Sequence, residues 1–139
     1  MDLAYLMTPF AAWLVAGCLK FAINSLKAGQ LAFGLIGYGG LPSNHSAIVS
    51  STAMLIALRE GLDHPAFGVA VTLAFIVLLD AASLRRQVGR QAEAINRLQG
   101  PQDKPLRERM GHTRVEIAAG VVTGCAVAWG VHAWPAFAP

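Results

Sequence analysis

Four apolar segments alternate with polar stretches along this chain, at residues 3–23, 46–58, 65–84 and 115–134. A membrane-crossing helix needs about 20 predominantly apolar residues, and three of the segments meet that length. The second would be only about 20 Å long, at about 1.5 Å per helical residue. The pattern predicts an all-α fold, a polytopic membrane helical bundle of about four spanning segments in one domain covering residues 1–139.

Glycine recurs just before the short second segment, at positions 34, 37, 39 and 40, and Pro42 follows. Such a run does not form a regular helix. Irregular backbone at membrane depth is tolerated only where it is buried in protein or lines a cavity. We therefore expect a glycine-rich re-entrant loop before a short helix that starts at a pocket. Ser43 and Ser46 are good N-cap residue types, and the helix start would present free N–H groups to an anion. A tight turn at the membrane surface with an ordinary serine cap fits the local sequence equally well.

Charge is distributed unequally between the ends of these segments. If every segment crosses the membrane, Arg59 lies on one side and the other ten of the eleven basic residues lie on or near the opposite side. The positive-inside rule makes that basic side cytoplasmic. Hydrophobic residues make up 55% of the chain and charged residues 14%, which excludes a soluble nucleic-acid-binding protein despite a pI near 9.2.

Three motifs fall on the basic side: residues 42–46, Asp80 followed by Arg85 and Arg86, and residues 111–116. Ionisable groups in or beside a membrane are candidates for function because burying them is costly. Arginine suits phosphate because its planar fork matches two oxygens. Asp80 has a plainer interpretation, a structural salt bridge to Arg85 or Arg86.

Histidine supplies the candidate acid–base groups of these motifs. His112 precedes Glu116 by four residues, so on a helix the two share a face, and the carboxylate can orient the imidazole and raise its basicity. Glu116 could instead only complement the dipole at a helix start. His45 could protonate a leaving oxygen. Together the motifs predict a site that handles phosphate.

These motifs resemble the divergent family of type-2 phosphatidic acid phosphatases, also labelled acid phosphatase or vanadium-dependent haloperoxidase-related. The similarity covers about residues 20–130, with the motifs in the expected order. It implies an integral-membrane phosphatase that hydrolyses a lipid-linked phosphomonoester or pyrophosphate without metal or cofactor, through a phosphohistidine. The implied partners are a phosphorylated lipid substrate and membrane lipids, with no nucleic acid.

The larger superfamily's pattern can be placed on this chain residue by residue. Ser43, Asn44 and His45 match its Pro-Ser-Gly-His motif, with Asn44 in place of glycine; His112 matches the nucleophile, and Glu116 replaces the aspartate four residues on. The superfamily arginine falls at Leu106, so either Arg107 or the pair Arg85 and Arg86 would take its role. Lys20 and Lys27 keep the spacing of the opening Lys-x6-Arg-Pro motif, without its arginine or proline. The predicted catalytic residues are His112, His45, Glu116 and Asp80, and the predicted phosphate-binding residues are Ser43, Asn44, Ser46, Arg85, Arg86, Lys20, Lys27 and Arg107.

Two other functions fit the same residues. A metal-dependent hydrolase would use His45, Asp80, His112 and Glu116 as ligands, and a non-catalytic protein would bind lipid phosphate without turnover. We expect a protein of the bacterial inner membrane whose site faces the cytoplasm. Gly120 and Gly124 have the small-residue spacing of close helix packing, which suggests a homo-oligomer or packing within one chain.

Overall fold

The computed structural model describes residues 3–31, 33, 40–100, 104–108 and 110–135, and within these ranges all regular structure is helical. The helices are α1 (Ala4–Ala28), α2 (Asn44–Glu60), α3 (Pro65–Ala82), α4 (Leu84–Leu98) and α5 (Arg114–Ala133). By length and composition, three helical runs could cross a membrane: α1, α5 and the 34-residue run Pro65–Leu98 formed by α3 and α4. The all-α membrane bundle expected from the sequence is therefore confirmed.

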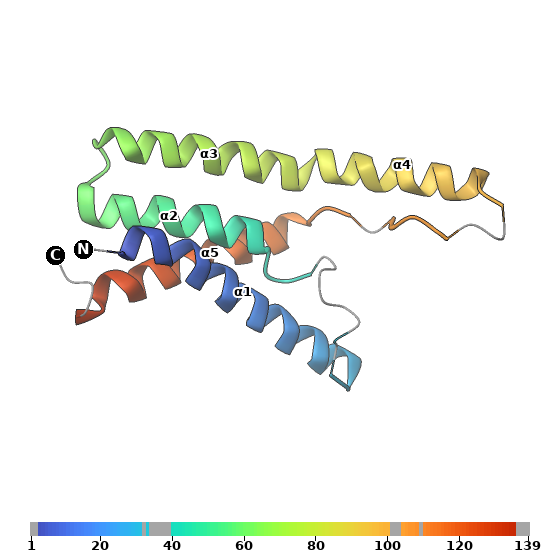
Figure 1. Ribbon diagram of the computed structural model, residues 1–139, viewed down its shortest axis with the longest axis horizontal. Helices are drawn as coiled ribbons and strands as arrows, with labels where there is room; N and C mark the ends of the chain where they lie inside the picture. Colours follow the sequence, from blue (N-terminus) through green and yellow to red (C-terminus); the bar gives the residue numbers. More distant parts are fainter. Residues whose placement is uncertain (1–2, 32, 34–39, 101–103, 109, 136–139) are drawn as a thin grey trace.

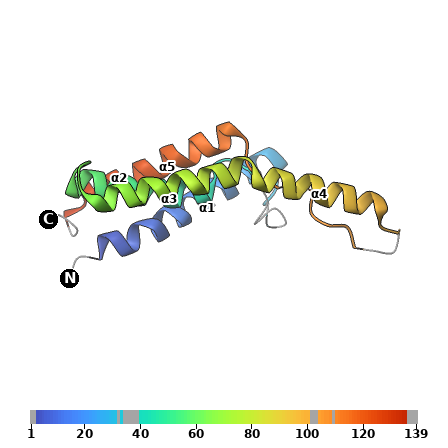
Figure 2. The same ribbon diagram turned by 90° about the horizontal axis from the view of Figure 1, so that it is seen from above.

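Helix α2, with 17 residues, is the short second segment, and it lies at the centre of the bundle against α1, α3 and α5 (Figures 1 and 2). Because its neighbours cover it, α2 can carry buried small polar residues such as Ser46, Ser50 and Ser51. The outer helices instead expose large apolar side chains, including Phe10, Trp13, Val69, Phe75, Ile76, Val122 and Trp129. This arrangement suits a bundle whose outer surface meets lipid.

Small residues bring α2 and α5 unusually close together. A Cβ atom built on Gly120 would clash with the carbonyl oxygen of Ser43, and one built on Gly124 would clash with that of Ala47. The glycine pair therefore packs within the chain. A homo-oligomer stays a prediction that these two glycines no longer support.

The polar stretch that follows the third apolar segment is helical as far as Leu98. Helix α4 continues from α3 through Ser83, whose N–H donates to Leu79 O at 2.9 Å and whose carbonyl accepts from Arg86 N at 3.1 Å. The apolar residues of α4 lie along one face of the helix and do not form a continuous run. The sequence pattern therefore predicted that the third apolar segment ends at Leu84. The chain then returns beside α4, where the Asn96 side chain hydrogen-bonds to both the N–H and the carbonyl of Leu106.

The loop before α2 is described only from Gly40 onward. Residues 34–39, which carry most of the predicted re-entrant loop, lie outside the described residues. Ser43 is the N-cap of α2, and its side-chain oxygen accepts from Ser46 N at 3.4 Å. Ser43 is therefore confirmed as a cap, whereas Ser46 lies inside α2.

Candidate functional site

Three helix ends that are far apart in the sequence meet at one end of the bundle. They are the start of α2, the junction of α3 with α4, and the residues just before α5 (Figure 1). His45 and His112 lie in two of them, with ring centroids 6.4 Å apart. This convergence agrees with the prediction that the three motifs lie on one side of the bundle.

Main-chain hydrogen bonds fix the frame that carries the two histidines. Ser43 N donates to Glu116 O at 2.9 Å, and His112 N donates to Ala81 O at 3.1 Å. Gly111 makes the turn before His112 with φ of 87°, a conformation that favours glycine. A Cβ there would also lie 3.1 Å from Cγ of Arg86. The α2 start, the α3 end and the α5 start are thus joined through backbone groups.

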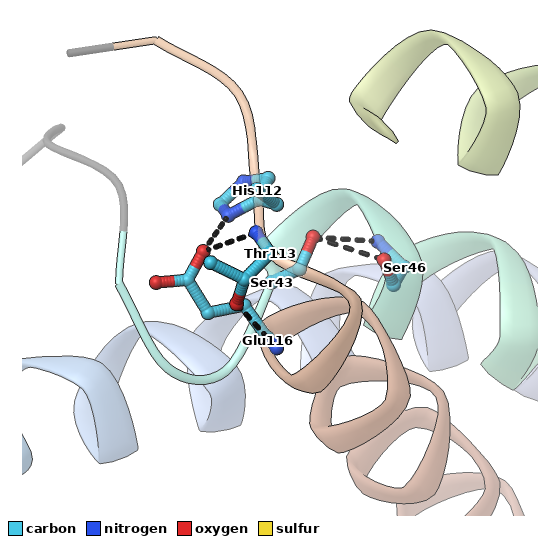
Figure 3. A network of polar contacts seen from close by, with 5 residues as sticks. All are labelled: Ser43, Ser46, His112, Thr113 and Glu116. Carbon is cyan, nitrogen blue, oxygen red and sulfur yellow. Dashed lines mark hydrogen bonds and ion pairs between the residues drawn. The ribbon is translucent and has the colours of Figure 1, made fainter. Parts of the chain in front are cut away.

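Glu116 holds His112 and the start of α5 with one carboxylate oxygen (Figure 3). Oε2 lies 3.2 Å from Nδ1 of His112 and accepts from Thr113 N at 2.9 Å. The hydroxyl oxygen of Thr113 accepts in return from Glu116 N at 3.2 Å, which completes a capping box. The two interpretations of Glu116 from sequence, imidazole partner and helix-start carboxylate, therefore describe the same oxygen.

This contact sets the chemistry available to His112. The side chain is only 7% exposed, and with Nδ1–H donated to the carboxylate the lone pair is left on Nε2. Burial lowers the pKa of His112 from its ordinary value near 6.5, opposed by the hydrogen bond to Glu116 and reinforced by the positive charges of Lys20 and Arg85. Burial and the two cations thus favour the neutral imidazole, which is the form that a nitrogen nucleophile requires.

Arg85 connects His45 to Asp80. Its Nη2 lies 3.2 Å from Nε2 of His45, and its Nε lies 3.6 Å from Oδ2 of Asp80. Because guanidinium only donates, Nε2 of His45 is the acceptor. Asp80 thus forms the ion pair that the plainer interpretation expected, and the pair lies against a candidate catalytic histidine.

The predicted phosphate-binding side chains at the start of α2 make contacts within the bundle. Ser43 and Ser46 are fully buried, and the Ser46 hydroxyl donates to Ser43 Oγ at 2.9 Å (Figure 3). The Asn44 amide reaches α1, with Nδ2 3.5 Å from Trp13 O. The observed contacts of all three side chains are therefore structural.

The four remaining predicted cations differ in position. Lys20, on α1, is close enough for its charge to act on both histidines. Lys27 is exposed two turns further along α1, and Arg86 is exposed on α4. Arg107 lies on the returning segment, next to the Leu106 that Asn96 holds. The structure thus groups Lys20 and Arg85 with the histidines and places Lys27 and Arg107 farther from them.

Some residues that build the site were not singled out from the sequence. Thr113 was readable, since Thr-x-x-Glu before an apolar run is a capping-box signature. The Ala81 carbonyl had no local signal, because its role depends on which segment packs alongside. In the described part of the chain, no three His, Cys, Asp or Glu side chains are grouped so as to hold a metal ion.

The fold and site define a small helical membrane protein with a histidine–carboxylate pair facing a second histidine and an arginine. The chain belongs to the divergent PAP2 family, whose model matches residues 1–127. It is 32% identical over 138 residues to an uncharacterized membrane protein of Bacillus subtilis strain 168, YuiD, with 86% of this chain and 87% of that protein covered. No solved structure matches the chain significantly. The family assignment made from the motifs is confirmed, and the relative's description agrees with a membrane location.

Proposed function

We propose that the protein is a membrane phosphatase that hydrolyses a lipid-linked phosphomonoester or pyrophosphate through a phosphohistidine on His112. The observation that carries the proposal is the His112–Glu116 contact, 3.2 Å between Nδ1 and Oε2, facing His45 across 6.4 Å between ring centroids. Membership of the divergent PAP2 family supports the class of reaction.

Both imidazoles belong to one site, with ring centroids 6.4 Å apart, and the proposed reaction gives each of them a separate role on one phosphoryl group. In the first step Nε2 of His112 bonds to phosphorus, the ester P–O bond breaks, and His45 gives a proton to the departing oxygen. In the second step water bonds to phosphorus, His45 takes a proton from that water, and the P–N bond breaks to release phosphate.

Charge on the transferring group would be met by the cations of the site. Phosphoryl transfer depends mainly on positioning and electrostatic stabilisation, and Arg85 and Lys20 both act electrostatically on the histidines. A substrate anchored in the bilayer fits a site at the end of apolar helices. The basic residues at that end support a cytoplasmic orientation in a bacterial inner membrane.

The test is phosphate release by the purified protein in detergent from phosphatidic acid, phosphatidylglycerol phosphate and polyprenyl phosphate and pyrophosphate. We expect turnover of at least one of them, unaffected by excess chelator, with an acid-labile phosphoprotein during turnover. Binding of these lipids without turnover would indicate the non-catalytic alternative. Loss of turnover on adding chelator would indicate a metal-dependent hydrolase.

A further inference from the structure

Arg85 bonds to the histidine that the proposed reaction needs as an acid. A general acid must carry its proton on the nitrogen that faces the leaving oxygen. In this structure Nε2 of His45 faces Nη2 of Arg85 at 3.2 Å, and arginine has no acceptor to offer a protonated nitrogen. In this arrangement Nε2 of His45 is therefore without a proton.

We propose that Asp80 is a positioning residue that holds Arg85 on His45 in the free protein, and that a bound phosphate takes over Arg85 and lets His45 accept a proton at Nε2. The inference rests on the proposed function. Asp80 is on the last turn of α3 and Arg85 on the first turn of α4, so the 3.6 Å ion pair fixes the guanidinium from the adjoining helix end.

The charges around His45 favour this exchange. The groups facing it are Arg85 from α4, Lys20 from α1, Asp80 from α3 and the imidazole of His112 before α5. Two of these are cations that oppose a protonated His45, and Asp80 is the one carboxylate that favours it. A phosphate dianion would neutralise the cations and present oxygens that match the guanidinium fork. Binding of phosphate would therefore be accompanied by uptake of a proton.

Proton uptake can be measured without turnover. Calorimetric titration of the detergent-solubilised protein with inorganic vanadate, in two buffers of different ionisation enthalpy, gives the number of protons taken up. We expect uptake in the native chain that is lost in His45→Gln. Binding without proton uptake, uptake that persists in His45→Gln, or no binding at all would overturn the inference.

Kinetics separate positioning by Asp80 from a purely structural role. In Asp80→Asn we expect turnover of a lipid phosphate to fall by about 10-fold, part of the about 10²–10⁴-fold that general acid catalysis contributes. The alkaline limb of its pH profile should move to lower pH. Once phosphate has taken over Arg85, the remaining effect of Asp80 on His45 is the negative charge that favours the protonated imidazole, and Asp80→Asn removes that charge. With p-nitrophenyl phosphate, whose leaving group needs no acid, the loss should nearly vanish, and Asp80→Glu should restore part of the activity.

Glu93→Gln is the matched control, since it removes an exposed ion pair with Arg97 from α4 outside the site. Glu93→Gln should leave turnover of both the lipid phosphate and p-nitrophenyl phosphate unchanged. Equal losses on both substrates in Asp80→Asn, or an unmoved alkaline limb, would make Asp80 merely structural. If the native chain turns over no phosphate ester, the proposed function fails, and the vanadate titration still decides whether phosphate displaces Arg85 from His45.

Discussion

The main-chain N–H of Ser43 donates a 2.9 Å hydrogen bond to the carbonyl oxygen of Glu116. This bond joins the start of α2 to the first turn of α5, two residues before His45 and four residues after His112. The relative position of the two histidines is therefore set by the backbone. Substitution of either imidazole should leave this frame in place, so that changes in activity report on chemistry.

Removing the nucleophile should abolish the reaction. We expect His112→Ala to lose turnover of lipid phosphate and to form no phosphoprotein, because it removes the imidazole whose Nδ1 is bonded to Glu116 and whose Nε2 is left with a lone pair. Phosphate release and acid-labile labelling measure this. His64→Asn is a suitable control, since His64 only caps α3 through Nδ1 and asparagine is a good N-cap. Near-native activity of His112→Ala would refute the assignment of roles.

Replacing His45 should give a defect that depends on the substrate. His45→Ala retains the attacking nitrogen but loses protonation of the leaving oxygen, so we expect a loss of about 10²–10⁴-fold with an alkyl phosphate. The loss should shrink for an aryl phosphate with a good leaving group. Comparing turnover of both substrates tests this, and an equal loss on both would argue that His45 only supports the fold.

The activity should fall on the acid side of the pH profile as His112 becomes protonated. Burial lowers the pKa of His112 from the ordinary histidine value of about 6.5. The acid limb of the kcat/KM profile should therefore lie below that pH. Glu116→Gln removes contributions that raise this pKa, so the limb should move to still lower pH while the plateau rate falls. Glutamine also fits a capping box, so the fold should be kept. A limb that moves to higher pH would contradict this account of the pair.

Close packing of α2 on α5 should make Gly120 intolerant of a side chain. Gly120→Ala places a methyl group against the carbonyl of Ser43, and we expect a loss of about 1–3 kcal/mol in stability, as for overpacked cores. Thermal unfolding in mild detergent measures it. Gly130→Ala is the matched control on the same helix, because a Cβ there meets nothing within 4 Å. Equal stability of the two variants would contradict the packing.

Orientation in the membrane can be tested with single cysteines in a chain whose Cys18 and Cys125 are replaced. We expect Lys104→Cys to be protected from an impermeant thiol reagent in intact cells and Asp63→Cys to react. Both positions are exposed and lie at opposite ends of the bundle. Reaction at residue 104 in intact cells would place the site outside and contradict the positive-inside interpretation.

Sequence reasoning succeeded where one local rule was sufficient. The spacing of His112 and Glu116 predicted their contact, although His112 lies just before the N-cap Thr113 and not on the helix itself. Counting apolar segments placed His45 at the same end. The sequence did not decide whether Arg85 or Arg86 faces the site. Neighbouring positions on a helix point about 100° apart, and only the packing of α3 on α2 decides which of the two faces inward. The spacing of Gly120 and Gly124 predicted close helix packing but did not identify α2 as the neighbouring helix. A pair of small residues does not specify which helix approaches it.

The length of α3 has a consequence for how the protein would encounter a lipid substrate. The 18 residues of α3 span about 27 Å, close to the roughly 30 Å hydrocarbon thickness, so a crossing by α3 would put Arg85 near the depth of the lipid headgroups. A lipid phosphate would then reach the site by lateral diffusion, with its tails still in their own leaflet. The rate would follow the substrate's mole fraction in the bilayer, and diluting it with inert lipid at constant total amount would slow the reaction.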